Sequence, residues 1–480
     1  MDPNTTPPTG KPTEGERLEV TLETMGSQAM AVARTGGFTL LVERGIPGER
    51  VEVEVNRVHS RHATAHVTQV LEPSSDREAP PCPVFEACGG CDWQHVKYET
   101  QVSYKREVVN DQLQRIGGLQ VDNDWPITTS PEKIAYRDKV EFVVTHDGLG
   151  YRPALHGVDP SQKVAIKECL LVPPEYTTLA ATALEMVAEH GDAEAIDPSA
   201  PNGLVRMSVQ GTLASGGNED IPALALTLHF ARRPKSAMRP FLREQLPRLL
   251  QDAFPNLETL LLSFKGMRED RLRNQQEVVA GRPFLLKPFG ADRYRLSASG
   301  FFQVNPAQAR NLRDTVLELV KKQSGSGGSE NTSSLIYDLF CGVGLYALPL
   351  ARQGYRVVGI EKQREAVRMA SNSAKNWGVR ADFQAADLAN PGVLKKQIAR
   401  SGSPQLVLVN PPRAGLPKPL METLLQEAPP ALIYISCDGG TFARDAQRLA
   451  SKYTLESLQG FDLFPQTHHL ELVGVFRRIG

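Results

Sequence analysis

The sequence predicts an α/β protein in three parts: a small β-barrel at the N-terminus, a mixed α+β region in the middle and a parallel-sheet domain at the C-terminus. Past residue 330, the short apolar runs LIYDLF, YRVVGIE, LVLVN and LIYIS alternate with helical segments, which is typical of a parallel sheet. Between Arg17 and Leu71, valine-rich alternating runs are separated by Gly and Pro-Gly turns, which indicates a barrel. We therefore expect a Rossmann-like C-terminal domain and a small N-terminal β-barrel.

The length of 480 residues is consistent with about three domains. We assign residues 1–16 to a disordered tail, 17–72 to the barrel, 80–315 to the central domain and 330–480 to the C-terminal domain. The Gly/Ser-rich segment KKQSGSGGSENTSS, from Lys321 to Ser334, is the clearest break in the chain.

The composition is that of an ordinary globular protein, with 41% hydrophobic and 23% charged residues. No apolar run approaches the roughly 20 residues that span a bilayer, and the N-terminus has no apolar signal-peptide core, so we expect no membrane association. Six sparse cysteines favour the reducing cytoplasm. A net charge of −1 gives no global sign of nucleic-acid binding. No motif indicates an obligate protein partner, and a monomer is expected.

The individual elements follow from local patterns. In the barrel, the expected strands are RLEVTLETM, AMAVAR, TGGFTLLVERG, GERVEVEVNRVHS and ATAHVTQVLE. In the central domain, QVSYKREVVNDQLQRIGG has helical periodicity that ends at a Gly pair, and KVEFVVT, LVRMSVQ and ALALTLHF predict strands of a mostly antiparallel sheet. The final run, LFPQTHHLELVGVFRRI, predicts a strand that closes the edge of the C-terminal sheet.

A candidate nucleotide site follows the first apolar run of the C-terminal domain. In LIYDLFCGVGLYALPL, Asp338 ends a strand, and Gly342 and Gly344 precede a helix, so the backbone can approach a ligand closely. Glu361 ends the next strand and is placed to accept hydrogen bonds from two ribose hydroxyls. Asp387, after the third run, is a candidate for the adenine amino group.

Three interpretations of this site are open. The stretch from Gly342 to Ala347 also satisfies the dinucleotide pattern G-x-G-x-x-A, and a tight glycine turn without a ligand is a further alternative. Two features favour S-adenosylmethionine. Asp338 suits a cationic amino-acid group better than a pyrophosphate, and the segment NPPR, from Asn410 to Arg413, follows the fourth run, where many methyltransferases carry their catalytic loop. We place Asn410 among the residues around the cofactor.

Cys437 is the candidate nucleophile. In YISCDGGTFARD it directly follows a strand, at the carboxyl edge of the sheet where open α/β folds bind ligands. A lone cysteine is more commonly a buried apolar residue, but Ser436, Asp438 and Gly439 favour a loop. Glu471, in FPQTHHLELV, is the candidate general base, although on its own it fits a solvated surface acid better.

Four further cysteines form a candidate metal site. Cys82, Cys88 and Cys91 cluster in CPVFEACGGCDWQH, whose Gly pair allows a tight turn, and Cys169 follows in KECLL. Four thiolates suit either a tetrahedral zinc ion or a [4Fe–4S] cluster, and the spacing does not choose between them.

Five motifs in order resemble the RNA uracil-5-methyltransferase family: SGFFQVN, DLFCGVG, NPPRAG, YISCDGGTFARD and FPQTHHLE. The resemblance implies methylation of carbon 5 of a uracil by S-adenosylmethionine, with Cys437 adding to carbon 6 and Glu471 removing the carbon 5 proton. It also implies that Gln303 contacts the cofactor and that Phe301 lies near the substrate.

The rest of the chain resembles one branch of this family. AVARTGGFTLLVERGIPGERVEVEV resembles a TRAM domain, an OB-like module that binds RNA. YRDKVEF matches a family element, which makes Arg137 and Lys139 candidate RNA contacts, with Arg413 of NPPRAG as a third. The cysteine pattern resembles that of the iron–sulfur branch, which implies a [4Fe–4S] cluster with a structural role. TRAM and cluster together imply ribosomal RNA, 23S rRNA in particular, as the target, with tRNA as the alternative.

Two departures from the family pattern leave other functions open. Asn410 stands where the family often has Asp, and CDGGT replaces the more usual CNPxT. The amide of Asn410 can accept a hydrogen bond from uracil N3–H and donate one to O4. The lost charge nevertheless makes a catalytically weakened RNA-binding or RNA-folding protein the second hypothesis. A dinucleotide-dependent oxidoreductase with an iron–sulfur centre is the third.

Overall fold

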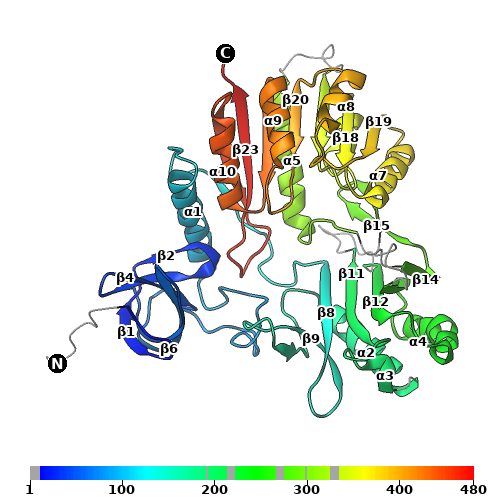
Figure 1. Ribbon diagram of the computed structural model, residues 1–480. Helices are drawn as coiled ribbons and strands as arrows, with labels where there is room; N and C mark the ends of the chain where they lie inside the picture. Colours follow the sequence, from blue (N-terminus) through cyan, green and yellow to red (C-terminus); the bar gives the residue numbers. More distant parts are fainter. Residues whose placement is uncertain (1–10, 191–192, 213–221, 266–274, 298–299, 325–333) are drawn as a thin grey trace.

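The computed structural model describes residues 11–190, 193–212, 222–265, 275–297, 300–324 and 334–480, and arranges their strands in four sheets (Figure 1). Residues 1–10 of the predicted tail, Ser299 of SGFFQVN and residues 325–333 of the predicted break lie outside the described residues. Residues 11–16 pack against the barrel, where the Gly15 amide donates to the Val55 carbonyl at 2.8 Å. The Gly/Ser-rich segment starts later than predicted, because Lys321 already belongs to a helix.

The N-terminal sheet has six strands, which curl into the barrel seen in Figure 1. In sheet order they are β1 (Arg17–Thr21), β5 (Arg50–Val58), β6 (His62–Glu72), β4 (Phe38–Glu43), β3 (Ala31–Thr35) and β2 (Thr24–Met25). The predicted run RLEVTLETM is divided between β1 and β2. Val51, Val53 and Val55 alternate with more exposed neighbours on β5 and fill the interior, as the period of two requires.

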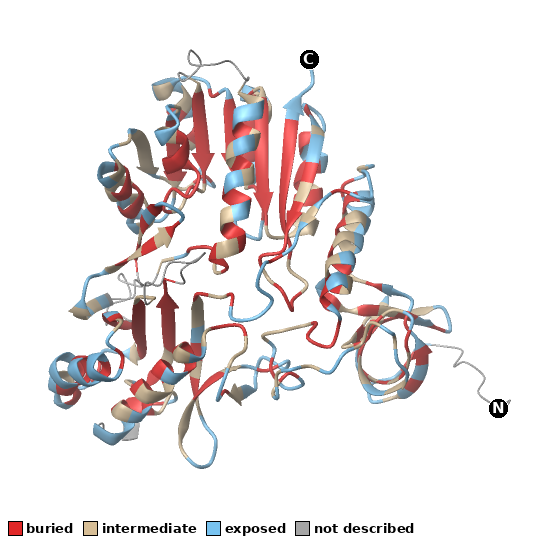
Figure 2. Ribbon diagram, turned by 180° about the vertical axis from the view of Figure 1, so that it is seen from behind, coloured by how far each residue is buried: buried red, intermediate tan, exposed pale blue. Residues whose placement is uncertain are grey.

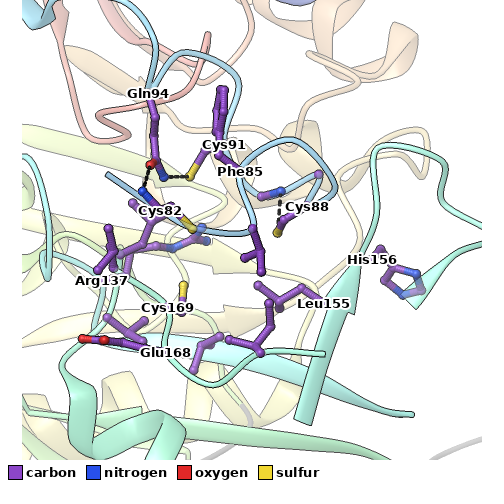
Figure 3. A pocket seen from close by; sticks show the side chains of 18 of the residues that line it. Cys82, Phe85, Cys88, Cys91, Gln94, Arg137, Leu155, His156, Glu168 and Cys169 are labelled. Carbon is purple, nitrogen blue, oxygen red and sulfur yellow. Dashed lines mark hydrogen bonds between the residues drawn. The ribbon is translucent and has the colours of Figure 1, made fainter. Parts of the chain in front are cut away.

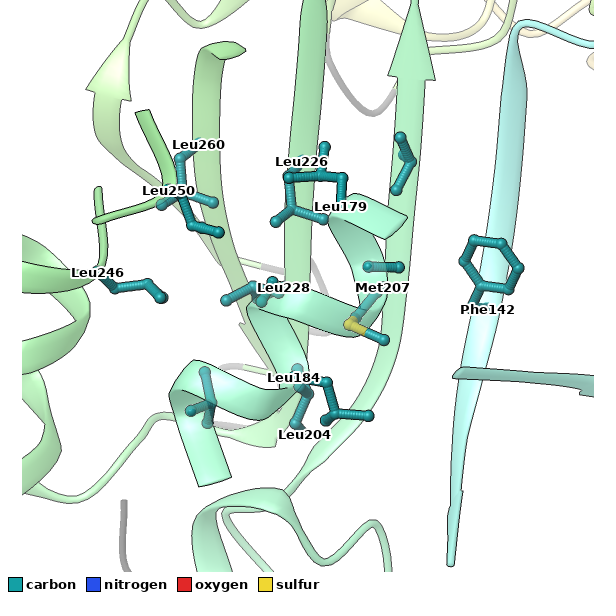
Figure 4. Close-up of a cluster of buried hydrophobic side chains, with 14 of the residues drawn as sticks. Phe142, Leu179, Leu184, Leu204, Met207, Leu226, Leu228, Leu246, Leu250 and Leu260 are labelled. Carbon is teal, nitrogen blue, oxygen red and sulfur yellow. The ribbon is translucent and has the colours of Figure 1, made fainter. Parts of the chain in front are cut away.

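The central sheet has seven strands and is mostly antiparallel, as predicted. In order they are β10 (Lys163–Ala165), β9 (Tyr151–His156), β8 (Lys139–His146), β11 (Leu204–Gly211), β12 (Leu224–Arg232), β13 (Leu257–Lys265) and β14 (Gln275–Gly281). Helices α2 (Pro174–His190), α3 (Ala193–Ile196) and α4 (Leu246–Ala253) lie beside it. Leu179, Leu226 and Leu250 belong to the apolar core between α2, α4 and the sheet (Figure 4). A hairpin of β15 (Phe284–Phe289) and β16 (Asp292–Ser297) connects this domain to the next.

The C-terminal sheet has eight strands, with parallel pairing in its first part. In order they are β19 (Ala381–Ala385), β18 (Arg356–Glu361), β17 (Leu335–Leu339), β20 (Leu406–Val409), β21 (Ala431–Ser436), β23 (Glu471–Arg478), β22 (Tyr453–Phe461) and β7 (Ile127–Thr128). The final strand does not close the edge as predicted. β23 lies between β21 and β22, where both of its faces are buried by the layers of helices (Figure 2).

Helices cover both faces of this sheet. The core of one face contains side chains from α1 (Tyr98–Arg115), α8 (Val393–Ser401), α9 (Lys418–Glu427) and α10 (Gly439–Leu449). The core of the other contains side chains from α5 (Pro306–Gln323), α6 (Ala347–Arg352) and α7 (Arg364–Trp377). None of the helices within the described ranges is long and apolar enough to cross a membrane. The resulting three-layer domain presents the carboxyl ends of its parallel strands at one edge.

Candidate active site

Cys437 and Glu471 meet at this edge of the sheet. Cys437 directly follows β21, and Glu471 is the first residue of β23, the antiparallel neighbour of β21. Because Ser436 is the register partner of Leu472, the next pair along the two chains is Cys437 and Glu471. The two predicted catalytic residues are therefore brought side by side from positions more than 30 residues apart in the sequence.

Burial and charge set the acidity of this pair. Desolvation raises the pKa of Glu471, which is 2% exposed, to about 7, and Arg413 opposes that rise. Desolvation and then the charge of Glu471 raise the pKa of the half-buried Cys437 thiol to about 11, and Arg413 again lowers it. Arg413 is thus the cation that favours the ionised form of both groups.

Arg413 is fixed by a partner that was not predicted, His469. The Arg413 guanidinium donates from Nη2 to Nε2 of His469 at 2.9 Å. Burial, followed by the charges of His468 and Arg413, lowers the pKa of His469 to about 3, so its ring is neutral and can accept this bond. The only sequence signal was the His-His doublet two residues before the candidate base.

The residues after Cys437 explain one departure from the family pattern. Asp438 is the N-cap of α10, and its carboxylate accepts a hydrogen bond from the Thr441 amide at 2.7 Å. Asp and Asn are comparably good at this position. A Cβ on Gly439 would lie 2.3 Å from Oε1 of Gln112, which shows how closely α1 approaches this turn. CDGGT therefore forms the same kind of strand-to-helix turn that an Asn in this position could cap.

Asp338 has the features of a site for a cationic ligand. It lies at 1% exposure on β17, where Oδ2 accepts a hydrogen bond from the Ala347 amide at 3.1 Å. Oδ1 is buried with no hydrogen-bond partner among the described residues. Desolvation raises the pKa of this carboxyl to about 7. An ammonium group would satisfy the orphan oxygen and restore the charge.

The glycines leave room beside Asp338. Gly342 has φ +54°, and a Cβ added there would meet nothing within 4 Å. Its amide donates to Oε2 of Glu361 at 3.2 Å, so the glycine turn and the end of β18 are held together. Gly344 has φ +87° and sits against Leu348 and Phe383, where a larger residue would clash. The glycine turn therefore leaves free space at Gly342 and is bonded to Glu361.

The remaining predicted cofactor residues have the following local contacts. Asp387 follows β19 and forms an ion pair with Lys362 at 2.7 Å, which lowers the pKa of Asp387. Asn410 follows β20, and its backbone N–H donates to the Leu339 carbonyl at 3.2 Å, beside the end of β17. Gln303 is buried, whereas Phe301, two residues earlier, has 72% of its surface exposed.

Arg137 and Lys139 line a cavity, and their role as RNA contacts stays a prediction. The Lys139 ammonium donates to the Gly300 carbonyl at 3.3 Å, and the Asp138 amide donates to the Val304 carbonyl at 2.9 Å. These residues therefore hold the segment that carries Gln303. The carbonyl that accepts the Lys139 hydrogen bond lies 161 positions along the chain, so the pattern YRDK does not indicate this contact.

The same cavity is lined by all four clustered cysteines (Figure 3). Cys82, Cys88 and Cys91 come from one loop, Cys169 from another, and the cavity has a volume of about 410 Å³. Gln94 donates to the Cys91 sulfur at 3.1 Å, and the Gly90 amide donates to the Cys88 sulfur at 3.4 Å. Burial raises the pKa of Cys91 to about 12. In the part of the chain that the structure describes, no three His, Cys, Asp or Glu side chains form a group that could hold a single metal ion.

Comparisons with known proteins agree with this architecture. A sequence model of the family tRNA (Uracil-5-)-methyltransferase matches residues 290–478, and one of the TRAM domain matches residues 11–68. A tRNA (uracil-54, C5)-methyltransferase of Pyrococcus abyssi, solved with S-adenosyl-L-homocysteine, has the same fold. Its TM-score is 0.68 at 24% identity, over 96% of this chain and all of that one.

Full-length relatives decide the family. A protein of Nitratidesulfovibrio vulgaris named as an uncharacterized RNA methyltransferase is 31% identical over 469 residues, covering 96% of this chain and 95% of its own. A protein with the same description from Nostoc sp. is 30% identical, with 96% of both chains covered. This chain belongs to the RNA uracil-5-methyltransferase family. As an RNA methyltransferase of this family, it has an S-adenosylmethionine-binding fold, and the oxidoreductase hypothesis is wrong.

Proposed function

We propose that this RNA methyltransferase methylates carbon 5 of a specific uridine in structured RNA, with Cys437 as nucleophile and Glu471 as base. The observation that carries the proposal is the pairing of a half-buried thiol with a buried carboxyl at the end of β21 and β23. Arg413 stands close enough to lower the pKa of both. A Rossmann-like edge with open glycine turns lies beside them.

The chemistry of uracil explains why both residues are needed. Carbon 5 is a weak nucleophile, so Cys437 adds to carbon 6 through its sulfur, and the electron pair of the 5,6 double bond makes carbon 5 nucleophilic. After carbon 5 is methylated, Glu471 removes its proton, the double bond reforms and the Cys437 thiolate leaves. A carboxyl whose pKa is about 7 is well matched to this proton transfer near neutral pH.

S-adenosylmethionine would supply the electrophilic methyl group on its sulfonium. The orphan oxygen of Asp338 fits its ammonium, and the Glu361 carboxylate fits the ribose hydroxyls. Gly342 lets the backbone approach without a side chain in the way. We assign Gln303, Asp387 and Asn410 to the remaining cofactor contacts.

We further propose that the four cysteines hold a [4Fe–4S] cluster. A zinc ion requires every sulfur at about 2.3 Å from one point, whereas a cubane holds its sulfurs farther apart. The proposal is supported by the four thiols that line one cavity of about 410 Å³. The Gln94 and Gly90 hydrogen bonds to sulfur suit thiolate ligands. Protein that contains iron and absorbs near ~400 nm after anaerobic purification would support this assignment, and stoichiometric zinc without iron would overturn it.

The RNA target has two candidates. TRAM plus a cysteine cluster favours 23S rRNA, whereas the family description and the P. abyssi fold relative name tRNA. The exposed ring of Phe301 is suited to stacking on an unpaired base, and Arg413 to contacting the substrate. Methylation of undermodified 23S rRNA and tRNA, mapped by mass spectrometry, distinguishes the two targets.

A trapping experiment tests the chemistry. Wild-type protein, labelled S-adenosylmethionine and RNA containing 5-fluorouridine should give a covalent adduct on a denaturing gel, because fluorine cannot be removed as a proton. Cys437→Ser, of nearly equal size, should give none. An absent adduct from cofactor-bound, RNA-bound wild type would overturn the proposal and favour the RNA-binding hypothesis that Asn410 suggested.

A further inference from the structure

The cysteine loop is bonded directly to the segment that ends in the candidate base. The amides of Asp92 and Trp93, the two residues after Cys91, donate to the Gln466 carbonyl at 2.9 and 3.0 Å. In return, the His468 amide donates to Oδ2 of Asp92 at 3.0 Å. A short reciprocal pairing therefore joins the wall of the cysteine cavity to a segment three residues before Glu471.

Asp92 also binds the side chain of this segment. Nδ1 of His468 lies 2.7 Å from Oδ2 of Asp92, so one carboxylate oxygen receives both the backbone and the ring of the same residue. Both side chains are less than one-third exposed. Two contacts from one residue to a single oxygen fix the direction of the imidazole as well as the position of the backbone.

From His468 the contacts continue to the catalytic cation. The His468 and His469 rings lie 4.1 Å apart between centroids, and His469 accepts the hydrogen bond from Arg413. Arg413 favours the ionised forms of Cys437 and Glu471. Three consecutive contacts thus lead from Asp92, the residue after Cys91, to the charge of Arg413.

The segment needs this support because its backbone is strained. Gln466 has φ +68°, a left-handed conformation that is uncommon for residues other than glycine. Gln101 of α1 holds it on both sides: its amide group donates to the Gln466 side chain, and its oxygen accepts from the Gln466 amide, each at 3.0 Å. Strain of this kind persists only where the surroundings determine it. The amides of Asp92 and Trp93 are part of those surroundings.

We propose that Asp92 and His468 are positioning residues that transmit the geometry of the cysteine site to the active site, through His469 and Arg413. The proposal rests on the roles assigned above to Cys437 and Glu471. When the cysteine loop is held in place, Arg413 is aimed at the thiol. When the loop is released, Arg413 loses its orientation while the Rossmann-like core stays folded. The side chain at position 468 must carry an N–H donor where His468 has Nδ1, because that donor faces Oδ2 of Asp92. An imidazole or an amide meets this requirement.

Alkylation of Cys437 tests this coupling without RNA or methyl donor. Iodoacetamide is added to the purified protein at fixed pH, and the rate is read for the Cys437 peptide by mass spectrometry. Asp92→Ala and His468→Ala should slow the reaction by about threefold to tenfold, since a rise of half to one unit in the thiol pKa reduces the thiolate by that factor. Arg413→Gln removes the cation itself and should therefore give the largest decrease in the alkylation rate.

Matched variants separate positioning from general damage. His468→Asn keeps a donor near the Nδ1 position and should recover most of the wild-type rate. Glu86→Ala, an exposed change in the same cysteine loop, should leave it unchanged. Loosened packing would expose Cys437 and increase its alkylation rate, whereas loss of positioning should decrease it. The direction of the change therefore distinguishes the two causes. An unchanged or faster rate in both alanine variants, or no recovery in His468→Asn, would overturn the proposal.

Two further measurements complete the test. Absorbance near ~400 nm shows whether His468→Ala keeps the cluster at the cysteine site. The melting temperature shows whether it keeps the fold. We expect His468→Ala to keep both and still to be alkylated more slowly at Cys437. In methylation assays the loss should fall on kcat rather than on KM for RNA. Wild type without a 5-fluorouridine adduct would refute the proposed reaction, whereas full kcat in His468→Ala would refute the coupling alone.

Discussion

Cys437 and Glu471 stand opposite each other at the ends of β21 and β23, one position beyond the register pair Ser436 and Leu472. Under the proposed reaction, this relationship places the nucleophile beside the base. It also brings two acidic groups together, and the negative charge of Glu471 raises the pKa of the Cys437 thiol. Arg413 offsets this repulsion from the neighbouring NPPR loop.

Replacement of the base should stop the reaction after methyl transfer. Glu471→Gln keeps the size of the side chain but cannot take the carbon 5 proton, so the methylated RNA should remain attached to Cys437. Turnover should fall by about 100-fold or more, in the range of general-base losses. A denaturing gel with ordinary uridine RNA measures the adduct. Glu456→Gln, an exposed acid on β22, is the control, and free methylated RNA released at the wild-type rate would contradict the role.

The pH dependence of stability should report the same carboxyl. The pKa of Glu471 is raised from 4.5 to about 7 in the folded protein. Its contribution to stability is therefore complete below pH 4.5 and is lost as the pH rises through about 7. Glu471→Gln should gain up to about 3 kcal/mol over wild type above pH 7 and nothing below pH 4.5. Urea unfolding at several pH values measures the difference; a gain that does not change with pH would exclude this cause.

Cofactor affinity should depend on the ionisation of Asp338. An ammonium ligand requires the carboxylate, whose pKa is raised to about 7 by burial. The affinity should therefore weaken by up to about tenfold for each pH unit below 7 and level off above it. Calorimetry with S-adenosylhomocysteine, which keeps the ammonium, measures this slope. Asp338→Asn should bind weakly and without the slope, and a retained slope in that variant would assign it to another group.

The turn after the nucleophile gives a stability prediction. Asp438→Ala removes the cap of α10 and should lower the free energy of unfolding by about 1 kcal/mol, whereas Asp438→Asn should change it little. Urea titration of the three proteins measures the difference. Equal losses in both variants would show that charge, and not capping, is what the site requires.

The sequence predicted the residues that lie at strand ends, and the reason is local. A strand-to-helix turn carries its own signals in glycines, caps and apolar runs, so Asp338, Glu361 and Cys437 could be placed before the fold was known. The placement of β23 could not, because insertion between two strands depends on tertiary packing that a single apolar run does not encode.

Long-range polar pairs were beyond the sequence for the same reason. Asp92 and His468 are 376 positions apart, and each alone resembles a surface residue. Likewise, nothing in the sequence indicates that the Lys139 ammonium donates a hydrogen bond to the carbonyl of Gly300, 161 positions away. The pattern of hydrophobicity predicts which face is buried, whereas the identity of a distant polar partner has no periodic signal.

A buried ion pair connects α1 to the catalytic segment and gives the last prediction. Lys105 and Asp462 are fully buried 2.7 Å apart, and the Tyr98 hydroxyl donates to the same carboxylate at 2.9 Å. Lys105→Met should cost about 3–5 kcal/mol, because it leaves Asp462 charged without a cation. Lys105→Met combined with Asp462→Asn should recover much of that loss, since the amide needs no counter-charge. Thermal unfolding measures both, and equal losses in the single and double variants would assign the effect to packing.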